Sequence, residues 1–343
     1  MNGRAWGWGV AALPRARGFA ALPRAWSGIA LPRAWGTAAL ALALLLLFID
    51  APAHAQGPAA CPPLPTVDDS PPRDRGLLWK LTRDGRSSYL FGTLHTGRPG
   101  WERFGPATAA ALRATDVLAL EVDPTDPATL SALAAPLSAP NAVALPEHLR
   151  QRLARAHDRA CLPAGALAAL HPLLQATVLS LGEARWLGLD AAFGQEALLA
   201  AHTRAAGRSV RALETVAQQW AALLPADPAD STTLIAQTLD QIDDGATRRV
   251  LARLVEVWSA GDVATLERYG AWCECAPSAE EQALMQRLND GRNPELADGI
   301  AALHGQGQRV FAAVGALHMT GSQALPRLLA ERGFRVDRVA FSR

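Results

Sequence analysis

Two hydrophobic segments, far apart in the chain, both run into a Gly-x-x-His turn. Residues 88–92 lead into Gly92-Thr93-Leu94-His95, and residues 309–315 lead into Gly315-Ala316-Leu317-His318. Ligands of open α/β sheets bind just past the carboxyl ends of strands, and glycine there lets the backbone turn sharply and approach a ligand. We therefore predict that the two turns meet at one functional site. The glycines that would shape the turns are Gly92, Gly97, Gly315 and Gly321.

The segments around these turns favour strands, whereas the middle of the chain favours helices. Residues 78–95 predict a hairpin with its turn at Asp84-Gly85, followed by a helix at 106–114 and a buried strand at 116–122. The end of the chain predicts a strand at 309–315, a helix at 323–332 and a strand at 334–341. Helical spacing of apolar residues marks 126–135, 146–159, 166–186, 194–206, 214–223, 231–259, 262–270 and 278–304, with a short strand at 208–213. We predict an α/β fold: a mixed central sheet formed by the N- and C-terminal parts of the domain, with a largely helical middle segment, about 126–305, as an insertion.

Two carboxylates follow predicted strands. Glu121 ends the strand at 116–122, where a buried carboxylate is costly unless it is paired or binds a metal. If the sheet is parallel here, Glu121 lies at the same edge as both histidines, and the three side chains form an open metal site with room for water. Otherwise it caps a helix or pairs with an arginine. Glu214, after the strand at 208–213, is either a second carboxylate of the site or a helix-start carboxylate.

The first 55 residues resemble a signal peptide. An uncharged apolar run at 37–49 is too short for a comfortable membrane-spanning helix, an unusually long basic region precedes it, and Ala53-His54-Ala55 supplies a cleavage signal. We predict cleavage before Gln56, a periplasmic or secreted protein, and no stable membrane span afterwards. The leader carries five arginines and one aspartate, so removing its +4 from a chain of +1 leaves about −3. The sequence contains no basic stripe that would indicate nucleic-acid binding. It also contains no phosphate-binding glycine loop that would indicate nucleotide binding.

Residues 56–76 are rich in proline and predict an extended linker before a domain at 77–343. The chain has four cysteines, and an even number in an exported protein favours disulfides. Because Cys273 and Cys275 are too close in sequence to pair easily, we expect each to pair with one of the other two. Metal binding by Cys-x-Cys is the alternative, but no second close pair completes it. The disulfide candidates are Cys61, Cys161, Cys273 and Cys275.

Several segments in a fixed order resemble the TraB/GumN family, which includes the eukaryotic Tiki proteins. The resemblance runs from about Leu77 to Val339 and implies an α/β core in which the two Gly-x-x-His turns belong to related halves. The matching segments are YLFGTLHTG (89–97), LALEVD (118–123), GLDAAFGQEAL (188–198), VRALETVAQQ (210–219), RN (292–293) and VGALHMTGSQALPRLLAERGFRV (314–336).

The resemblance also implies a chemistry. Tiki proteins are metal-dependent peptidases, with manganese or cobalt as the implied metals and zinc as a further candidate. Their paired histidine turns and following acidic residue correspond to His95, His318 and Glu121, which we take as metal ligands, or Glu121 as the general base. Arg292 and Asn293 match a pair of the family. We assign Arg292 to oxyanion stabilisation, or else to a solvated helix end, and Asn293 to substrate orientation.

The function that we predict is a metal-dependent hydrolase, in particular a peptidase, acting on a peptide or protein outside the cytoplasm. The alternative is a non-catalytic protein that binds a peptide or an envelope component in the same cleft. A structural role in an envelope assembly is a third. The sequence contains neither the H-E-x-x-H pattern of zinc peptidases nor a Gly-x-Ser-x-Gly nucleophile turn.

Overall fold

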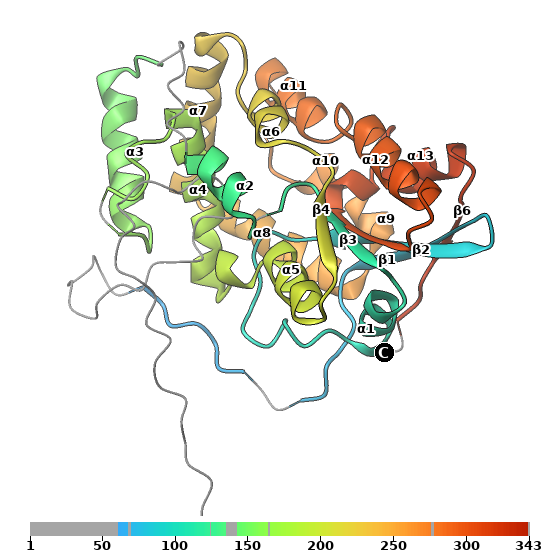
Figure 1. Ribbon diagram of the computed structural model, residues 1–343. Helices are drawn as coiled ribbons and strands as arrows, with labels where there is room; N and C mark the ends of the chain where they lie inside the picture. The colour runs from blue at the N-terminus through green and yellow to red at the C-terminus, as the bar shows by residue number, and fades with distance from the viewer. Residues whose placement is uncertain are drawn as a thin grey trace, which may run out of the picture. The chain divides into compact units, whose positions relative to one another are not determined.

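The structure is a computed structural model that describes residues 61–67, 70–123, 125–134, 143–163, 165–275 and 278–341. The predicted signal peptide lies outside them. Six strands form one mixed sheet in the order β4-β3-β5-β2-β1-β6 (Figure 1), which confirms the predicted fold class. β2, β5, β3 and β4 run parallel, while β1 pairs antiparallel with β2 and β6. The strands are β1 (Leu77–Arg83), β2 (Arg86–Thr93), β3 (Val117–Leu120), β4 (Ser209–Ala212), β5 (Val310–Gly315) and β6 (Arg335–Arg338).

Local sequence explains the strands. Asp84 and Gly85 both have positive φ, 52° and 71°, as the two-residue hairpin turn between β1 and β2 requires. All four residues of β3 are buried, as are Val310–Val314 of β5. Such continuous apolar runs are typical of parallel strands that are covered on both faces. The predicted strand at 334–341 is shorter than expected, since β6 comprises only Arg335–Arg338.

Helices make up most of the remainder. Each of two long helices predicted from the sequence is divided into two in the structure. The predicted helix at 231–259 is interrupted at Gly245, whose φ is 77°. The predicted helix at 278–304 is interrupted at residues 289–292. The predicted helix at 166–186 begins only at Pro172, after His171 accepts the Leu173 N–H. No helix in the described ranges is long and apolar enough to cross a membrane. The helices are α1 (Pro106–Arg113), α2 (Pro127–Ala134), α3 (Glu147–Arg159), α4 (Pro172–Gly182), α5 (Gln195–Ala205), α6 (Val216–Leu223), α7 (Pro228–Asp243), α8 (Ala246–Ala260), α9 (Val263–Leu266), α10 (Tyr269–Trp272), α11 (Ala279–Leu288), α12 (Asn293–Gly305) and α13 (Leu325–Glu331).

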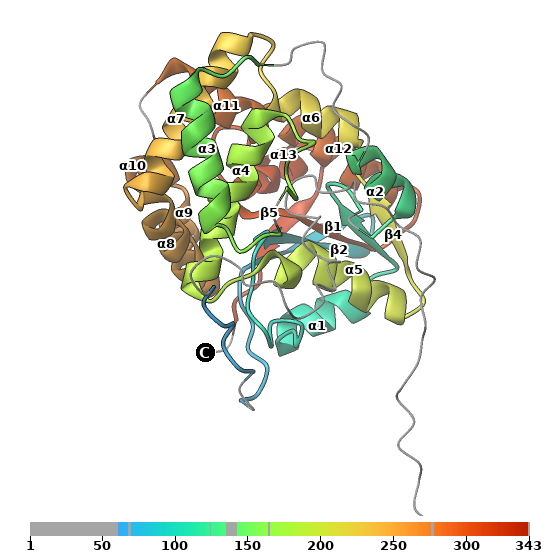
Figure 2. The ribbon, with the colours of Figure 1, turned by 90° about the vertical axis from the view of Figure 1, so that its left-hand side faces the viewer.

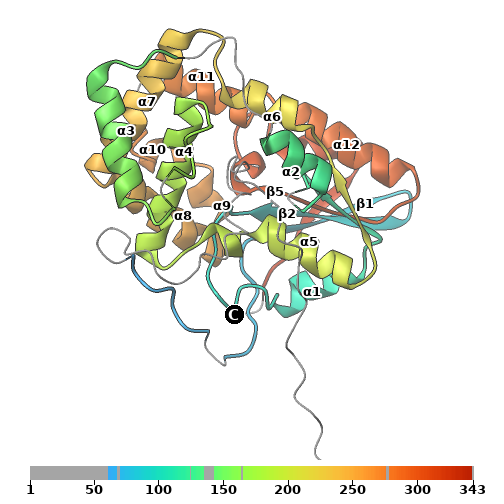
Figure 3. The ribbon, with the colours of Figure 1, turned by 60° about the vertical axis from the view of Figure 1, so that its left-hand side comes forward.

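The helices pack in two groups around two hydrophobic clusters. The larger cluster contains the sheet together with residues of α1, α5, α8, α12 and α13. α5 contacts β3 and β4, α12 contacts β5, and the two helices lie on opposite sides of the sheet (Figure 3). The smaller cluster lies between α3, α4 and α7, which stand side by side (Figure 2) and away from the sheet (Figure 1).

The proline-rich segment before β1 contacts the domain at several points. Arg185 donates to the Pro62 carbonyl at 3.0 Å, and Arg103 donates to the Ser70 carbonyl at 3.2 Å. The Asp74 carboxylate accepts the Ala107 and Thr108 N–H groups at 2.9 and 2.8 Å, so it caps α1. A carboxylate there also favours the positive end of the helix dipole.

The disulfide pairing that we expected is wrong. The structure pairs Cys61 with Cys161, and Cys273 with Cys275. The short pair is possible because Glu274 between the two cysteines has a positive φ of 51°, and the Cα atoms lie 5.0 Å apart, within the usual range for a disulfide.

Candidate functional site

The four parallel strands all present a chemically active side chain just past their carboxyl ends. Because β2, β5, β3 and β4 run parallel and in register, these ends lie at one edge of the sheet. Both histidine turns and Glu121 therefore lie at this edge, together with a second glutamate. The side chains are His95 after β2, His318 after β5, Glu121 after β3 and Glu214 after β4.

The turn after β2 needs its glycines. A Cβ on Gly97 would lie 2.0 Å from the Phe193 carbonyl oxygen, because Gly97 and Asp190 exchange two backbone hydrogen bonds of 2.9 and 2.8 Å. A Cβ on Gly92 would lie 3.2 Å from the Cα of Ala316, in the other turn. The glycines thus allow the two turns to pack against each other and against the segment that leads into α5.

His95 is held by a carboxylate that the sequence analysis did not identify. Its Nδ1 lies 3.0 Å from Oε1 of Glu196, in the first turn of α5, and the interaction raises the pKa of His95 to about 9. Thr93 also donates to Glu196, at 2.5 Å. With Nδ1 bound to Glu196, Nε2 is the nitrogen available to a ligand. A carboxylate behind an imidazole is a common arrangement at metal sites.

The backbone before His95 is fixed by Gln195. Its side-chain oxygen accepts the Leu94 N–H at 2.9 Å, and its own N–H donates to the Leu94 carbonyl at 3.1 Å. The signal for Gln195 and Glu196 in the sequence is the Gly-Gln-Glu segment at the start of α5. Gly194 is required there because a Cβ would lie 2.6 Å from the His95 carbonyl oxygen.

His318 is held differently, by an amide. Its Nδ1 lies 2.5 Å from Oδ1 of Asn293, while the Asn293 NH₂ group donates to the carbonyls of His318 and Gln323 at 3.2 and 2.7 Å. Since two carbonyl acceptors fix the NH₂ group, Oδ1 must accept from Nδ1, and the lone pair of His318 lies on Nε2. Burial lowers the pKa of His318 to about 4, so the ring is neutral at pH 7.

The role that we expected for Asn293 is therefore wrong. Asn293, the first residue of α12, is fully buried, and its side chain hydrogen-bonds to three protein groups. It orients His318 rather than a substrate.

Arg292 bridges the two glutamates. Its Nη2 lies 2.5 Å from Oε2 of Glu121, and its Nε donates to Oε1 of Glu214 at 2.9 Å. The Arg292 side chain is only 14% exposed, so it is not a solvated helix-end arginine. Glu214 lies within the site, while Thr215 caps α6.

The charges of this bridge determine the protonation of both carboxylates. Burial disfavours the charged form of Glu121, but Arg292, followed by His318 and His95, outweighs it and holds the pKa of Glu121 well below its usual range. Burial raises the pKa of Glu214 despite Arg292. Burial also opposes the charge on Arg292, yet Glu121 and Glu214 raise its pKa. At neutral pH the bridge therefore contains a charged Glu121 and a charged Arg292.

These groups line one wall of a cavity of about 410 Å³. His95, His318, Glu121 and Arg292 all contribute to the wall at the edge of the sheet. Helices of the middle segment form most of the remaining wall, mainly with leucine, valine and methionine side chains. The site thus combines charged groups with an enclosed apolar surface, as small-molecule and peptide sites commonly do.

The donor chemistry of the site fits a metal only in part. Among the residues described, no three His, Cys, Asp or Glu side chains are close enough to hold one ion. Glu121 is engaged, since Oε1 accepts the Gly315 N–H at 2.7 Å and lies 3.7 Å from Nε2 of His318, while Oε2 meets Arg292. The two imidazoles meet one requirement of a metal ligand, because each has Nδ1 bound to an acceptor, which leaves Nε2 as the ligand nitrogen.

Gly321 lies three residues after His318, at the end of the second turn. It has a φ of 84°, and a Cβ there would lie 2.8 Å from the Asp290 carboxylate. Asp290 also accepts from Ser322 at 2.9 Å, so this carboxylate fixes the chain just after His318. A side chain at position 321 would therefore disturb the His318 turn.

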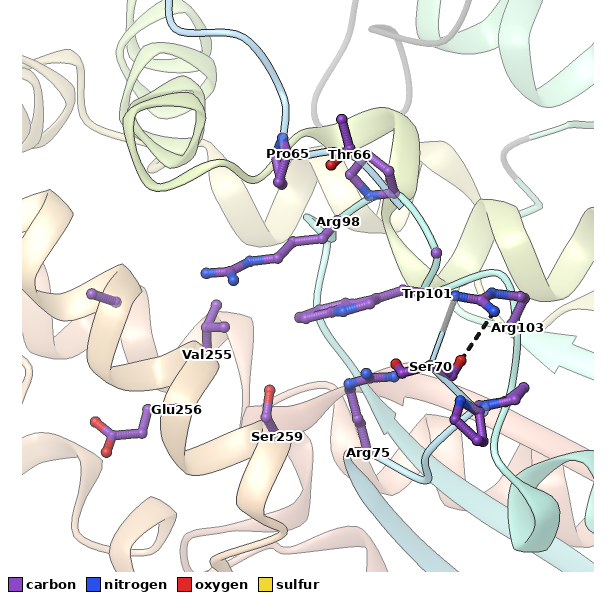
Figure 4. Close-up of a pocket in the computed structure, with 15 residues that line it drawn as sticks. Pro65, Thr66, Ser70, Arg75, Arg98, Trp101, Arg103, Val255, Glu256 and Ser259 are labelled. Atoms are coloured by element: carbon purple, nitrogen blue, oxygen red, sulfur yellow. Dashed lines mark hydrogen bonds between the residues drawn. The ribbon is translucent and has the colours of Figure 1, made fainter. Parts of the chain in front are cut away.

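A second cavity, of about 470 Å³, lies between the proline-rich segment, the loop after His95 and α8 (Figure 4). Arg75, Arg98 and Trp101 are among its lining residues, and the Arg75 guanidinium lies 5.6 Å from the centre of the Trp101 ring. None of His95, His318, Glu121 and Arg292 lines it.

The fold and the site define an α/β protein with a His–Glu–Arg centre at the carboxyl ends of the parallel strands of a mixed sheet. The chain belongs to the TraB/PrgY/gumN family, whose model matches residues 77–338. This match confirms the family resemblance inferred from the sequence. Comparisons with curated proteins and with solved structures found no match.

Proposed function

We propose that this protein is a metal-dependent hydrolase that cleaves peptide bonds outside the cytoplasm. The observation that carries the proposal is the pair of imidazoles that line one cavity, each with its Nδ1 anchored by a protein acceptor and its Nε2 available. The adjacent Arg292 supplies a positive charge beside them.

The residues would divide the work as follows. His95 and His318 would hold a manganese, cobalt or zinc ion, which when bound lowers the pKa of a water molecule and polarises a carbonyl group. To do so, His95 must release its extra proton, because its pKa is raised to about 9 by Glu196. Asn293 and Glu196 keep the two rings in position.

Glu121 and Arg292 would act on the proton and on the developing negative charge. Arg292 can stabilise an oxyanion, since it is a largely buried cation at the cavity wall. As the oxyanion attracts Arg292, the carboxylate of Glu121 loses part of its compensation, and burial then favours its protonation. Glu121 is therefore the natural acceptor for the proton of the attacking water.

The compartment is proposed from the sequence. The apolar run at 37–49 with its cleavage signal supports export, and two disulfides suit an oxidising environment.

Metal content and peptide cleavage, measured on the same samples, test this proposal. The chain from Gln56 onward would be compared with His95→Ala/His318→Ala and with His148→Ala, which changes an exposed histidine of α3. Chelated protein would be reloaded with manganese, cobalt or zinc and incubated with a peptide library, and circular dichroism would check folding.

We expect metal-dependent cleavage by the parent chain and the His148 variant, and neither metal binding nor cleavage by the folded double variant. Peptide binding without cleavage under every metal would instead indicate the non-catalytic binding protein. Full cleavage by the double variant would exclude the site.

A further inference from the structure

The part of the cavity wall that the helices of the middle segment supply is largely apolar but not fully buried. Its residues come from α4, α6, α8 and α11, which belong to the helical middle of the chain. Each is half-buried, so each keeps part of its apolar surface in the cavity. Clustered apolar surface of this kind is unfavourable in water and commonly marks a binding site. The residues that define this apolar wall are Leu181, Leu223, Leu251, Leu254, Met285 and Leu288.

The cavity is large enough for a bulky group. A cavity of roughly 150 Å³ lined by similar side chains holds a benzene molecule. The cavity here has a volume of about 410 Å³, which leaves room for an aromatic or branched aliphatic side chain together with part of a peptide backbone.

Polar groups along the same cavity favour a peptide over a simple acyl chain. Ser180, Gln219 and Asn289 also line it, and Gln219 donates to Glu121 at 3.4 Å, which places one of these amides beside the charged groups. A peptide backbone carries N–H and C=O groups that need such partners, whereas an acyl chain does not.

We infer that the apolar wall is a specificity pocket for a large apolar side chain next to the peptide bond that is cleaved. This inference rests on the proposed hydrolase function. The sheet edge would supply the chemistry, and the helical middle segment would select the substrate. Substrates with leucine, phenylalanine or tryptophan at that position should therefore be preferred to those with alanine, aspartate or lysine.

The test separates binding from catalysis. Leu223→Trp fills the pocket from α6. Leu224→Trp is the matched control, because Leu224 is the next residue, is also half-buried, and packs against the α3–α4–α7 cluster instead of lining the pocket. Binding of the neutral fluorescent probe N-phenyl-1-naphthylamine would be titrated with each protein, and then displaced by peptides of graded side-chain size and by a fatty acid.

We expect one probe per chain, at least tenfold weaker binding to Leu223→Trp, unchanged binding to Leu224→Trp, and displacement by peptides with large apolar side chains. Cleavage by the parent chain should fall at least about tenfold when leucine in the substrate is replaced by alanine, since one methylene in such a pocket already changes kcat/KM by about 10- to 200-fold.

Three results would overturn the inference: equal probe binding by both variants, equal displacement by charged and apolar peptides, or displacement by the fatty acid alone. Binding that follows the expected pattern without cleavage of any peptide would leave the pocket in place and refute the hydrolase proposal instead.

Discussion

Replacing Arg292 with methionine should destabilise the protein by about 3–5 kcal/mol at pH 7, the usual cost of breaking a buried ion pair by removing one partner. Arg292 is 14% exposed and lies 2.5 Å from Glu121 and 2.9 Å from Glu214. Both glutamates are themselves buried, at 7% and 6% exposure. Methionine fills much of the space but leaves two carboxylates without their cation.

The loss should depend on pH. Burial already raises the pKa of Glu214 in the native protein, and without Arg292 that pKa rises further. A carboxyl group whose folded pKa lies above its unfolded value binds its proton more tightly in the folded state, so stability falls as the pH rises through that range. The variant should therefore recover stability, relative to the native protein, as the pH is lowered from about 7 towards 5.

Urea denaturation followed by circular dichroism, at pH 5 and pH 7, measures both effects. Arg292→Met/Glu214→Gln should recover about half of the loss at pH 7, because one of the two uncompensated charges is gone. The control Arg327→Met breaks an exposed pair with Glu331 and should cost less than about 1 kcal/mol. A loss at Arg292 no larger than that of the control, or a double variant no more stable than the single one, would refute the buried bridge.

Three further predictions concern the surroundings of the site. Asn293→Ala should weaken metal binding about 10- to 100-fold, measured by calorimetry, while Asn293→Asp, which keeps an acceptor for His318, should lose less. Gly97→Ala should lower the melting temperature of the protein, because the new Cβ would clash with the Phe193 carbonyl. Gly182→Ala, at the end of α4, should instead stabilise the protein by about 0.5–1 kcal/mol, because nothing lies within 4 Å of the new Cβ. Cys61→Ser/Cys161→Ser opens a loop with a sequence separation of 100 and should cost up to about 4.7 kcal/mol in urea denaturation, far more than Cys273→Ser/Cys275→Ser, whose separation is 2; equal losses would contradict the chain-entropy reasoning.

The parts of the site that follow strands could be predicted from the sequence. The strand pattern in the sequence shows where each strand ends, and parallel pairing brings the carboxyl ends to one edge of the sheet. His95, His318 and Glu121 could therefore be placed together from the sequence alone. Arg292 could be proposed only through the family resemblance. Its helix begins at a break between α11 and α12, and the apolar spacing of residues 278–304 continues across that break.

The partners that hold the two imidazoles could not be predicted, because they come from helices. Nothing in the periodicity of residues 194–206 shows that the first turn of α5 faces the β2 turn, so Glu196 went unidentified. Asn293 was identified but given the wrong role, because the sequence does not determine whether its amide points into the cavity or into the protein interior. The disulfide pairing failed for a local reason: the positive φ of Glu274 is not encoded by a glycine.

These partners give two similar turns opposite electrostatic properties. Glu196 is a carboxylate, so it stabilises a proton on His95 and raises its pKa to about 9. Asn293 is a neutral amide and adds no charge. Burial, with the positive charges of Arg292 and His95, outweighs the attraction of Glu121, so the pKa of His318 falls to about 4. At neutral pH one Gly-x-x-His turn therefore presents a cation and the other presents a lone pair, although both follow adjacent parallel strands. The protonation of each imidazole is thus determined by the groups that surround it, Glu196 of α5 at His95 and burial beside Arg292 at His318, rather than by the turn motif itself.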